Sequence, residues 1–137
     1  VGEGDFLIPA IQRLIDSYKM ERREAGEYAL LKASIRAVEL NKDSFDSTKE
    51  KILNLLLNNF TTEQSKDLID SWLVCGDYLL QPFNSGFDYV VGNPPYIRQE
   101  SIPEVLLSEY KKHFTTIYDR ADIYVPFIEK SLLHLSN

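Results

Sequence analysis

The most informative stretch of the sequence is residues 87–96, which read FDYVVGNPPY. Residues 87–92 are apolar on both faces, a pattern that predicts a buried strand of a parallel sheet. Two consecutive prolines cannot lie in a central strand, so Asn93–Tyr96 is predicted to leave the sheet as a loop. Open α/β sheets bind their ligands beyond the carboxyl ends of their strands. The loop is therefore the first candidate for a functional site.

The residue types of this loop suit a planar amine or amide. The side-chain oxygen of Asn93 and the carbonyl of Pro94 both accept hydrogen bonds, and the prolines hold these acceptors in place before a substrate arrives. Tyr96 offers an aromatic face to a planar group. A nitrogen held in this way needs no general base before it attacks an electrophile, because it loses its proton after it has become cationic. The structural alternative is a rigid turn with a packed tyrosine.

The rest of the sequence alternates predicted helices and strands, which is typical of an α/β fold with a parallel sheet. Strands are predicted over residues 34–40 and 71–75. Helices are predicted over residues 6–24, from Asp43 or Ser44 to Phe60, over 62–69, from a capping box at 101–104 to Phe114, and over 120–135.

Three other features follow or precede these elements at positions suited to an adenosine-containing ligand. The turn that contains Gly2 and Gly4 would let backbone N–H groups approach a ligand closely. Glu39 ends the first predicted strand, where a carboxylate can accept both hydroxyls of a ribose. Asp77 follows the next strand and could accept from an exocyclic amine, while Tyr78 could lie against a flat ring. The alternative for the glycine turn is a plain loop, and the alternative for Glu39 is a solvated strand end. The alternative for Asp77 is an Asx-turn that stabilises its loop.

A nicotinamide dinucleotide is a poorer ligand for this pattern. Its fingerprint requires a third glycine and an acid about 20 residues further on. Here Gly4 is followed by Asp5, Phe6 and Leu7, and Glu39 comes later than that spacing.

Length and composition limit the class of protein. The chain has 137 residues, 44% of them hydrophobic, which suits one globular domain. Its 15 basic and 21 acidic residues give a net charge of −6, which argues against a free-standing, non-specific binder of nucleic acid or anionic membranes. It remains compatible with a catalytic piece whose DNA contacts come from another segment. The single cysteine, Cys75, excludes a disulfide framework and a cysteine-based zinc site.

No targeting or metal-binding signal is present in the sequence. No apolar run approaches the roughly 20 residues of a membrane span, no signal peptide is visible, and no histidine pair has metal-ligand spacing. We therefore expect a cytoplasmic protein without a metal site. Because the chain does not begin with methionine, we also expect it to be a piece of something longer.

In order and spacing, these motifs resemble those of S-adenosylmethionine-dependent N6-adenine DNA methyltransferases, as in the methylase parts of type II restriction–modification enzymes. Residues 2–7 are similar to the tail of that family's cofactor loop, and residues 77–79 to its acidic third motif. Residues 87–98 are close to its catalytic motif, and residues 121–130 (ADIYVPFIEK) resemble the helix that follows it.

The resemblance implies an α/β fold with a Rossmann-like sheet, truncated here because the first strand and the C-terminal strands are missing. Residues 1–137 would be a partial catalytic domain with a cofactor loop at 1–7 and a catalytic loop at 93–96, and the target-recognition domain would lie outside the chain. With its central strand absent, we expect this piece alone to be inactive.

The resemblance also implies a role for each candidate residue. The S-adenosylmethionine ligands would be Gly2 and Gly4 for the methionine part, Glu39 for the ribose, Asp77 for the adenine amine, and Tyr78 and Phe127 on either side of the adenine ring. The catalytic loop would be Asn93, Pro94, Pro95 and Tyr96, with Asn93 and Pro94 holding the amine of a flipped-out adenine and Tyr96 stacking on the base.

The implied partner is double-stranded DNA, bound through the absent recognition domain, in the cytoplasm of a bacterium or archaeon. An endonuclease, fused or separate, is compatible with the resemblance, and a membrane partner is not expected. The alternatives are a protein glutamine-N5 methyltransferase, an RNA guanine-N2 methyltransferase, and a non-catalytic methylase-like subunit used for DNA recognition.

Overall fold

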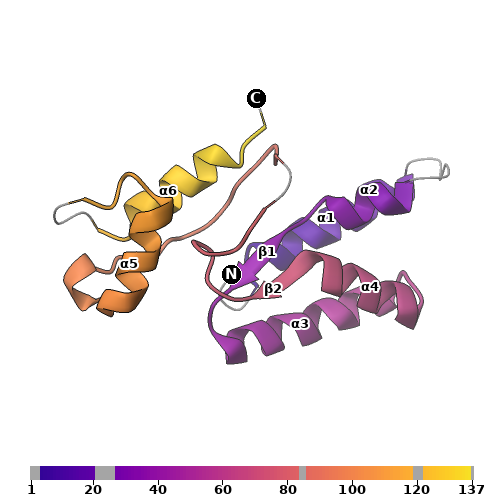
Figure 1. Cartoon of the computed structure of the whole chain (residues 1–137). Helices are drawn as coiled ribbons and strands as arrows, with labels where there is room; N and C mark the ends of the chain where they lie inside the picture. Colours follow the sequence, from indigo (N-terminus) through magenta and orange to yellow (C-terminus); the bar gives the residue numbers. More distant parts are fainter. Residues whose placement is uncertain (1–3, 21–26, 84–85, 119–121, 137) are drawn as a thin grey trace. The chain divides into compact units, whose positions relative to one another are not determined.

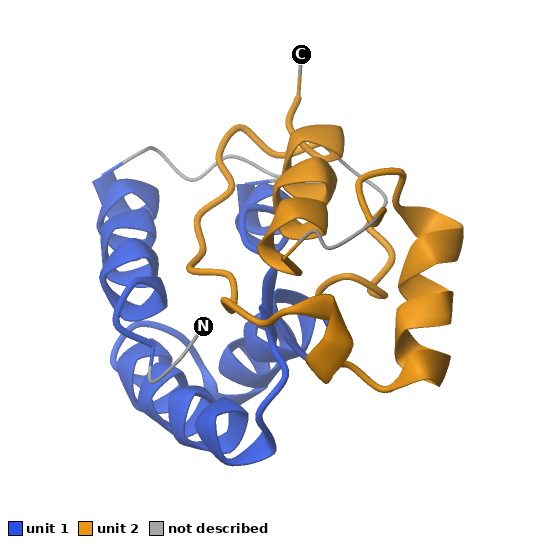
Figure 2. Ribbon diagram, turned by 90° about the vertical axis from the view of Figure 1, so that its left-hand side faces the viewer, with its two compact units in different colours: residues 1–77 blue, residues 78–137 orange. Residues whose placement is uncertain are grey.

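The computed structural model of the chain describes residues 4–20, 27–83, 86–118 and 122–136. The chain divides into two compact units, residues 1–77 and residues 78–137 (Figure 2). Each unit has a buried hydrophobic cluster of its own.

The first unit is built from helices and two short strands. In chain order they are α1 (Leu7–Met20), α2 (Glu27–Ala33), β1 (Ala37–Glu39), α3 (Lys42–Leu57), α4 (Thr62–Trp72) and β2 (Leu73–Cys75) (Figure 1). The two strands were predicted, as were α1, α3 and α4, although α4 runs three residues further than expected before β2 begins. The end of the helix predicted over 6–24 lies outside the described residues.

β1 and β2 pair in parallel, with Ala37 opposite Leu73 and Glu39 opposite Cys75. A hairpin cannot join parallel strands, so the connection between them must cross over. Here α3 and α4 form that crossover and pack against each other. The predicted parallel arrangement is thus confirmed for these two strands.

The two crossover helices begin with side-chain caps, one of them at a residue other than those predicted. Asn41, rather than Asp43 or Ser44, is the N-cap of α3, and its side-chain oxygen accepts from the N–H of Ser44 at 2.9 Å. The strand ends at Glu39, so Asn41 is the first residue able to cap while still extended. A reciprocal capping box between Thr61 and Gln64 begins α4.

All four helices of this unit and the strand β2 contribute side chains to its core. Trp72 is fully buried, and its indole N–H donates to the carbonyl of Leu31 in α2 at 3.0 Å. The other buried members are Ile11, Ile15, Leu31, Ile52, Leu56, Leu68, Ile69 and Leu73. The short helix α2, which was not predicted, is held against α4 by this contact and by a group of polar side chains.

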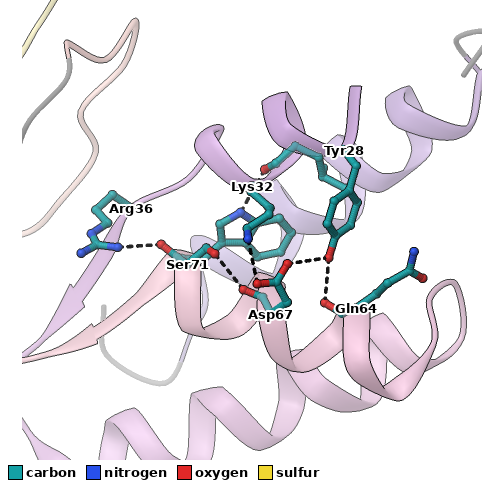
Figure 3. Close-up of polar contacts among 8 residues, drawn as sticks. Tyr28, Lys32, Arg36, Gln64, Asp67 and Ser71 are labelled. Atoms are coloured by element: carbon teal, nitrogen blue, oxygen red, sulfur yellow. Dashed lines mark hydrogen bonds and ion pairs between the residues drawn. The ribbon is translucent and has the colours of Figure 1, made fainter. Parts of the chain in front are cut away.

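The polar group joins α2 to α4 around one carboxylate (Figure 3). Asp67 accepts from the hydroxyl of Tyr28 at 3.0 Å and from the ammonium of Lys32 at 2.7 Å. Burial, with the hydrogen bond to Asp67, raises the pKa of Tyr28 to about 12. The bond from Lys32, assisted by that from Tyr28, lowers the pKa of Asp67. Nearby, Arg36 donates to the carbonyl of Ser71 at 2.7 Å.

The second unit contains a 3₁₀ turn, η1 (Gln99–Ser101), and the helices α5 (Glu104–His113) and α6 (Tyr124–Leu133). Its core comprises Leu79, Tyr110, Phe114, Ile117 and Ile123. The predicted capping box at 101–104 is wrong: Ser101 belongs to η1, and Pro103 precedes α5 without a side-chain cap. The helix predicted over 120–135 is confirmed as the shorter α6.

The strand predicted over residues 87–92 is not formed. Phe87 makes an isolated bridge to Leu135, and the following residues belong to no strand. Tyr89 is 86% exposed and Val91 75% exposed, so the segment is not buried either. A strand needs neighbours for its backbone groups, and among the described residues the one sheet is the β1–β2 pair.

The position of two adjacent leucines on α3 yields a test of the core. Leu56 is fully buried and Leu57 is 44% exposed. We expect Leu56→Ala to lower the free energy of unfolding by about 2–5 kcal/mol, since it leaves a cavity. Leu57→Ala should change it by about 0.5 kcal/mol. Urea unfolding followed by the fluorescence of Trp72, the single tryptophan, measures both; equal losses would contradict the assigned core.

The hydrogen bonds of the Asp67 carboxylate predict how the stability of the protein depends on pH. Its lowered pKa means that its contribution to stability is present above about pH 4 and is lost as the pH falls through the folded-state value. Asp67→Asn should therefore be less stable than the wild type at pH 7, and the difference should shrink as the pH falls below about 4 towards the lowered folded-state pKa of Asp67. Asp70→Asn, an exposed site on the same helix, is the matched control and should keep the wild-type pH profile. A constant gap between Asp67→Asn and wild type would refute the assignment.

Candidate functional site

Gly4 occupies a position that requires glycine. Its φ is +90°, and a Cβ there would lie 2.9 Å from Cδ1 of Ile8 and 3.2 Å from Cγ2 of Thr48. The carbonyl of Gly4 accepts from the N–H of Ile8 at 2.9 Å, so the glycine stands directly before α1. The following N–H groups of a helix have no partner within it. Packing within this unit and the positive φ therefore both require glycine at position 4. Gly2 lies outside the described residues.

Glu39 and Asp77 lie at the same edge of the small sheet. Glu39 is the last residue of β1 and pairs with Cys75, the last of β2; its carbonyl accepts from the N–H of Gly76 at 2.9 Å. Asp77 follows immediately. One carboxylate oxygen of Glu39 accepts from the N–H of Asn41 at 2.8 Å, which fixes the side chain at the turn into α3. Both acids are half-buried. The sequence-based expectation that these strand ends meet is confirmed.

In the second unit, the segment that contains the catalytic-loop candidates is tethered at both ends to the flanks of α6. At one end, Phe87 donates its N–H to the carbonyl of His134 at 2.7 Å and accepts from Ser136 at 2.9 Å. At the other end, Arg98 pairs with Asp122, and Ile97 accepts from Ile123 at 2.9 Å. The chain between therefore runs from the end of α6 back to its beginning (Figure 1).

Within this tethered segment, the side chains of the Asn-Pro-Pro-Tyr motif face solvent. Asn93 and Pro95 are exposed and Pro94 is half-buried. Tyr96 is 81% exposed, and its ring centre lies 5.9 Å from that of Tyr124, the first residue of α6, at an interplanar angle of 50°. The tilted contact covers little of the Tyr96 ring, which leaves a face for stacking.

Tyr78 and Phe127 are close to each other, in an arrangement that differs from the expected one. Their rings stack with centres 5.2 Å apart and an interplanar angle of 20°. A third ring between them would need a separation of about 7 Å, twice a van der Waals contact. The two residues therefore do not flank a common ring in this structure. Burial raises the pKa of the Tyr78 hydroxyl, so it stays protonated at neutral pH.

Sequence reasoning missed two charged residues of α6 that have well-defined contacts. Glu129 accepts from the backbone N–H and the hydroxyl of both Thr115 and Thr116, at 2.6–3.1 Å. Burial acts to raise the pKa of Glu129, but these four hydrogen bonds outweigh it and the pKa is lowered. Lys130 is only 5% exposed and donates to the carbonyls of the segment after Asp77. A lysine in an otherwise apolar helix face was the available signal.

The described part of the chain contains no group of three or more histidine, cysteine, aspartate or glutamate residues placed to hold a metal ion. In the same residues, no helix combines the length and the apolar character needed to cross a membrane. Cys75 is exposed.

Comparison with known proteins gives consistent matches over nearly the whole chain. Residues 16–137 match the model of the Eco57I restriction-modification methylase family. The chain is 49% identical over 136 residues to the type II methyltransferase M.PaeR7I of Pseudomonas aeruginosa and 43% identical over 133 residues to M.XhoI of Xanthomonas vasicola. These alignments cover 98% and 96% of the chain and 24% of each relative.

A shorter match, 36% identical over 61 residues, is to the type II restriction enzyme and methyltransferase RM.Eco57I of Escherichia coli, covering 40% of the chain and 6% of that protein. The chain spans about a quarter of the length of the two longer matches. The family match covers far more than half of the chain, so the chain belongs to the Eco57I restriction-modification methylase family.

Proposed function

We propose that this chain is part of an S-adenosylmethionine-dependent DNA methyltransferase that methylates the N6 amine of adenine in a restriction–modification system. Membership of the Eco57I methylase family and the names of the relatives support methyl transfer in such a system. The observation that carries the adenine-N6 proposal is the exposed Asn93–Tyr96 loop, held at both ends against α6.

In this proposal the loop binds the substrate amine through two acceptors. The carboxamide oxygen of Asn93 and the carbonyl of Pro94 accept the two amine N–H groups of a flipped-out adenine, which directs the nitrogen lone pair away from the loop. As the nitrogen becomes cationic its N–H groups become stronger donors, so the same acceptors bind it more tightly. Tyr96, with its exposed ring, stacks on the base; such stacking contributes about 1–3 kcal/mol.

The residues of the first unit fit the cofactor that this chemistry requires. S-Adenosylmethionine supplies a methyl group bonded to a positively charged sulfur. Gly4, where a Cβ would collide with Ile8, provides the close backbone approach for its methionine part, together with Gly2. Glu39 and Asp77, at one edge of the sheet, provide acceptors for the ribose hydroxyls and the adenine amine. Tyr78 and Phe127 belong to the second unit and stack on each other, so we propose that the pair contacts the adenine together rather than from opposite faces.

The crossover β1–α3–α4–β2 supports the wider proposal of a Rossmann-like methyltransferase sheet, of which β1 and β2 are two neighbouring strands. We propose that a recognition domain outside these residues binds the double-stranded DNA. This fits the net charge of −6, because an acidic chain binds DNA poorly by itself. The printed name of RM.Eco57I combines a restriction enzyme with a methyltransferase, which makes an endonuclease, fused or separate, the expected companion. We further propose a cytoplasmic location, where the DNA substrate lies.

The methylation assay is the direct test of this function. The complete natural protein is incubated with S-adenosylmethionine and unmethylated bacterial DNA, which is then digested to nucleosides and analysed by mass spectrometry. We expect N6-methyladenine, and a rate reduced at least about 100-fold in Asn93→Ala, since a positioned polar group at the reacting atom is lost. Asn54→Ala, at an exposed site on α3, should retain the wild-type rate.

Four other outcomes would each reject the adenine-N6 proposal or its catalytic loop. Methylated glutamine in protein, or methylguanine in RNA, would assign the activity to another nitrogen. DNA binding without any methyl transfer would leave a recognition subunit. Equal rates in Asn93→Ala and Asn54→Ala would reject the loop as the catalytic element.

The role proposed for Asp77 can be tested with a pair of ligands. S-Adenosylhomocysteine is compared with its analogue in which hydrogen replaces the 6-amino group. If Asp77 accepts from that amine, Asp77→Ala should weaken binding of S-adenosylhomocysteine about 10–100-fold and that of the analogue much less, because the analogue has no N–H to lose. Calorimetric titration gives both dissociation constants. An equal loss for the two ligands would place Asp77 elsewhere in the site.

A further inference from the structure

One face of α6 holds the ring of Tyr78. Phe127 stacks on it, the Nζ of Lys130 lies 5.3 Å from its centre, and the hydroxyl oxygen of Ser131 lies 3.0 Å from the tyrosine oxygen. Ser131 donates its own proton to the carbonyl of Phe127 at 2.7 Å, so Tyr78 is the donor in the bond between the two hydroxyls. Positions three and four residues apart share a helix face, and these three side chains form one surface.

Lys130 is the polar centre of that surface. Its side chain is 5% exposed, and its Nζ donates to the carbonyl of Leu79 at 2.9 Å and to that of Gln81 at 2.6 Å. The same Nζ lies 5.0 Å from the ring centre of Phe83. A buried lysine is rare because the charge is costly to desolvate. Here the carbonyls and the two aromatic faces compensate that cost.

The two carbonyls belong to the segment directly after Asp77. Residues 78–80 form a turn, and both Leu79 and Gln81 direct their carbonyl oxygens at one nitrogen. An apolar side chain at position 130 could fill the same volume but would leave these carbonyls without that donor. The two hydrogen bonds from Lys130 therefore hold the path of residues 78–81.

We infer that Lys130 is a positioning residue for cofactor binding, which acts by fixing the backbone of residues 78–81 and the ring of Tyr78. This inference rests on the proposed function, because it assigns Tyr78 to the adenine site. It predicts a defect in cofactor binding, because the Nζ of Lys130 contacts the segment from Tyr78 to Phe83 through two backbone carbonyls and two aromatic rings.

The test compares Lys130→Met, Lys130→Arg and the control Lys111→Met in the complete natural protein. Lys111 is an exposed residue of α5. For each protein we would measure the dissociation constant of S-adenosylhomocysteine, the KM values for S-adenosylmethionine and DNA, and kcat.

Lys130→Met should raise the dissociation constant and the cofactor KM about tenfold or more, with the DNA KM within about twofold of wild type. Lys130→Arg, which can donate to both carbonyls, should recover most of the affinity. Lys111→Met should match the wild type.

A Lys130→Met protein with wild-type cofactor affinity would overturn the inference, and so would parallel losses for cofactor and DNA. If Lys130→Met does not fold, Lys130→Gln, which keeps one donor, replaces it and should show the same selective defect to a smaller degree. Failure of both to fold would assign Lys130 to stability and also reject the inference. Wild-type protein that binds S-adenosylhomocysteine without methylating DNA would reject the proposed substrate, while the dissociation constants would still decide the role of Lys130.

Discussion

The parallel pairing of β1 with β2 is the constraint on which the first unit depends. Two strands that run the same way must be joined by a crossover, which α3 and α4 provide while packing against each other. The same direction brings both carboxyl ends to one edge, so Glu39 and Asp77 become neighbours although 38 positions separate them in the sequence. A Cβ at position 4 would lie 3.2 Å from Cγ2 of Thr48, so the loop before α1 lies close to α3, the helix that follows β1. The candidate cofactor residues of this unit are therefore brought together by topology.

Sequence patterns predicted best the elements whose signals are local. The stripe of Ile11 and Ile15 in α1 and that of Ile52 and Leu56 in α3 are periodic over several turns, and both stripes are buried. The helix α2 has seven residues, too few for such a pattern, and it owes its position to distant contacts of Tyr28 and Lys32 with Asp67. The N-cap of α3 was missed because Asn41, Asp43 and Ser44 have equally suitable side chains; the choice depended on where β1 ends.

The predictions that failed needed a partner whose distance the sequence does not encode. An apolar run such as residues 87–92 indicates a segment suited to a buried strand, but the run does not show whether neighbouring strands are present. In the described residues this segment pairs only at Phe87. The aromatic residues Tyr78 and Phe127 were predicted for the same site, and they do meet. Their ring centres, however, are 5.2 Å apart, so the two rings stack on each other and do not flank a third ring. Residue type suggested the chemistry, and packing determined the geometry.

In the second unit, α6 contacts both of the candidate functional segments. Its flanking residues tether the stretch from Phe87 to Arg98 at both ends, and its inner face holds the backbone after Tyr78 through Lys130. On a further side, Glu129 caps the turn at Thr115 and Thr116. Charged side chains in a mostly apolar helix would be costly unless each met several hydrogen-bond partners. Both do, so the two charges that interrupt the apolar pattern mark where the helix fixes irregular backbone. Among the described residues of this unit no sheet orders the Asn93–Tyr96 loop or the Tyr78 segment, and the contacts with α6 hold both in defined positions.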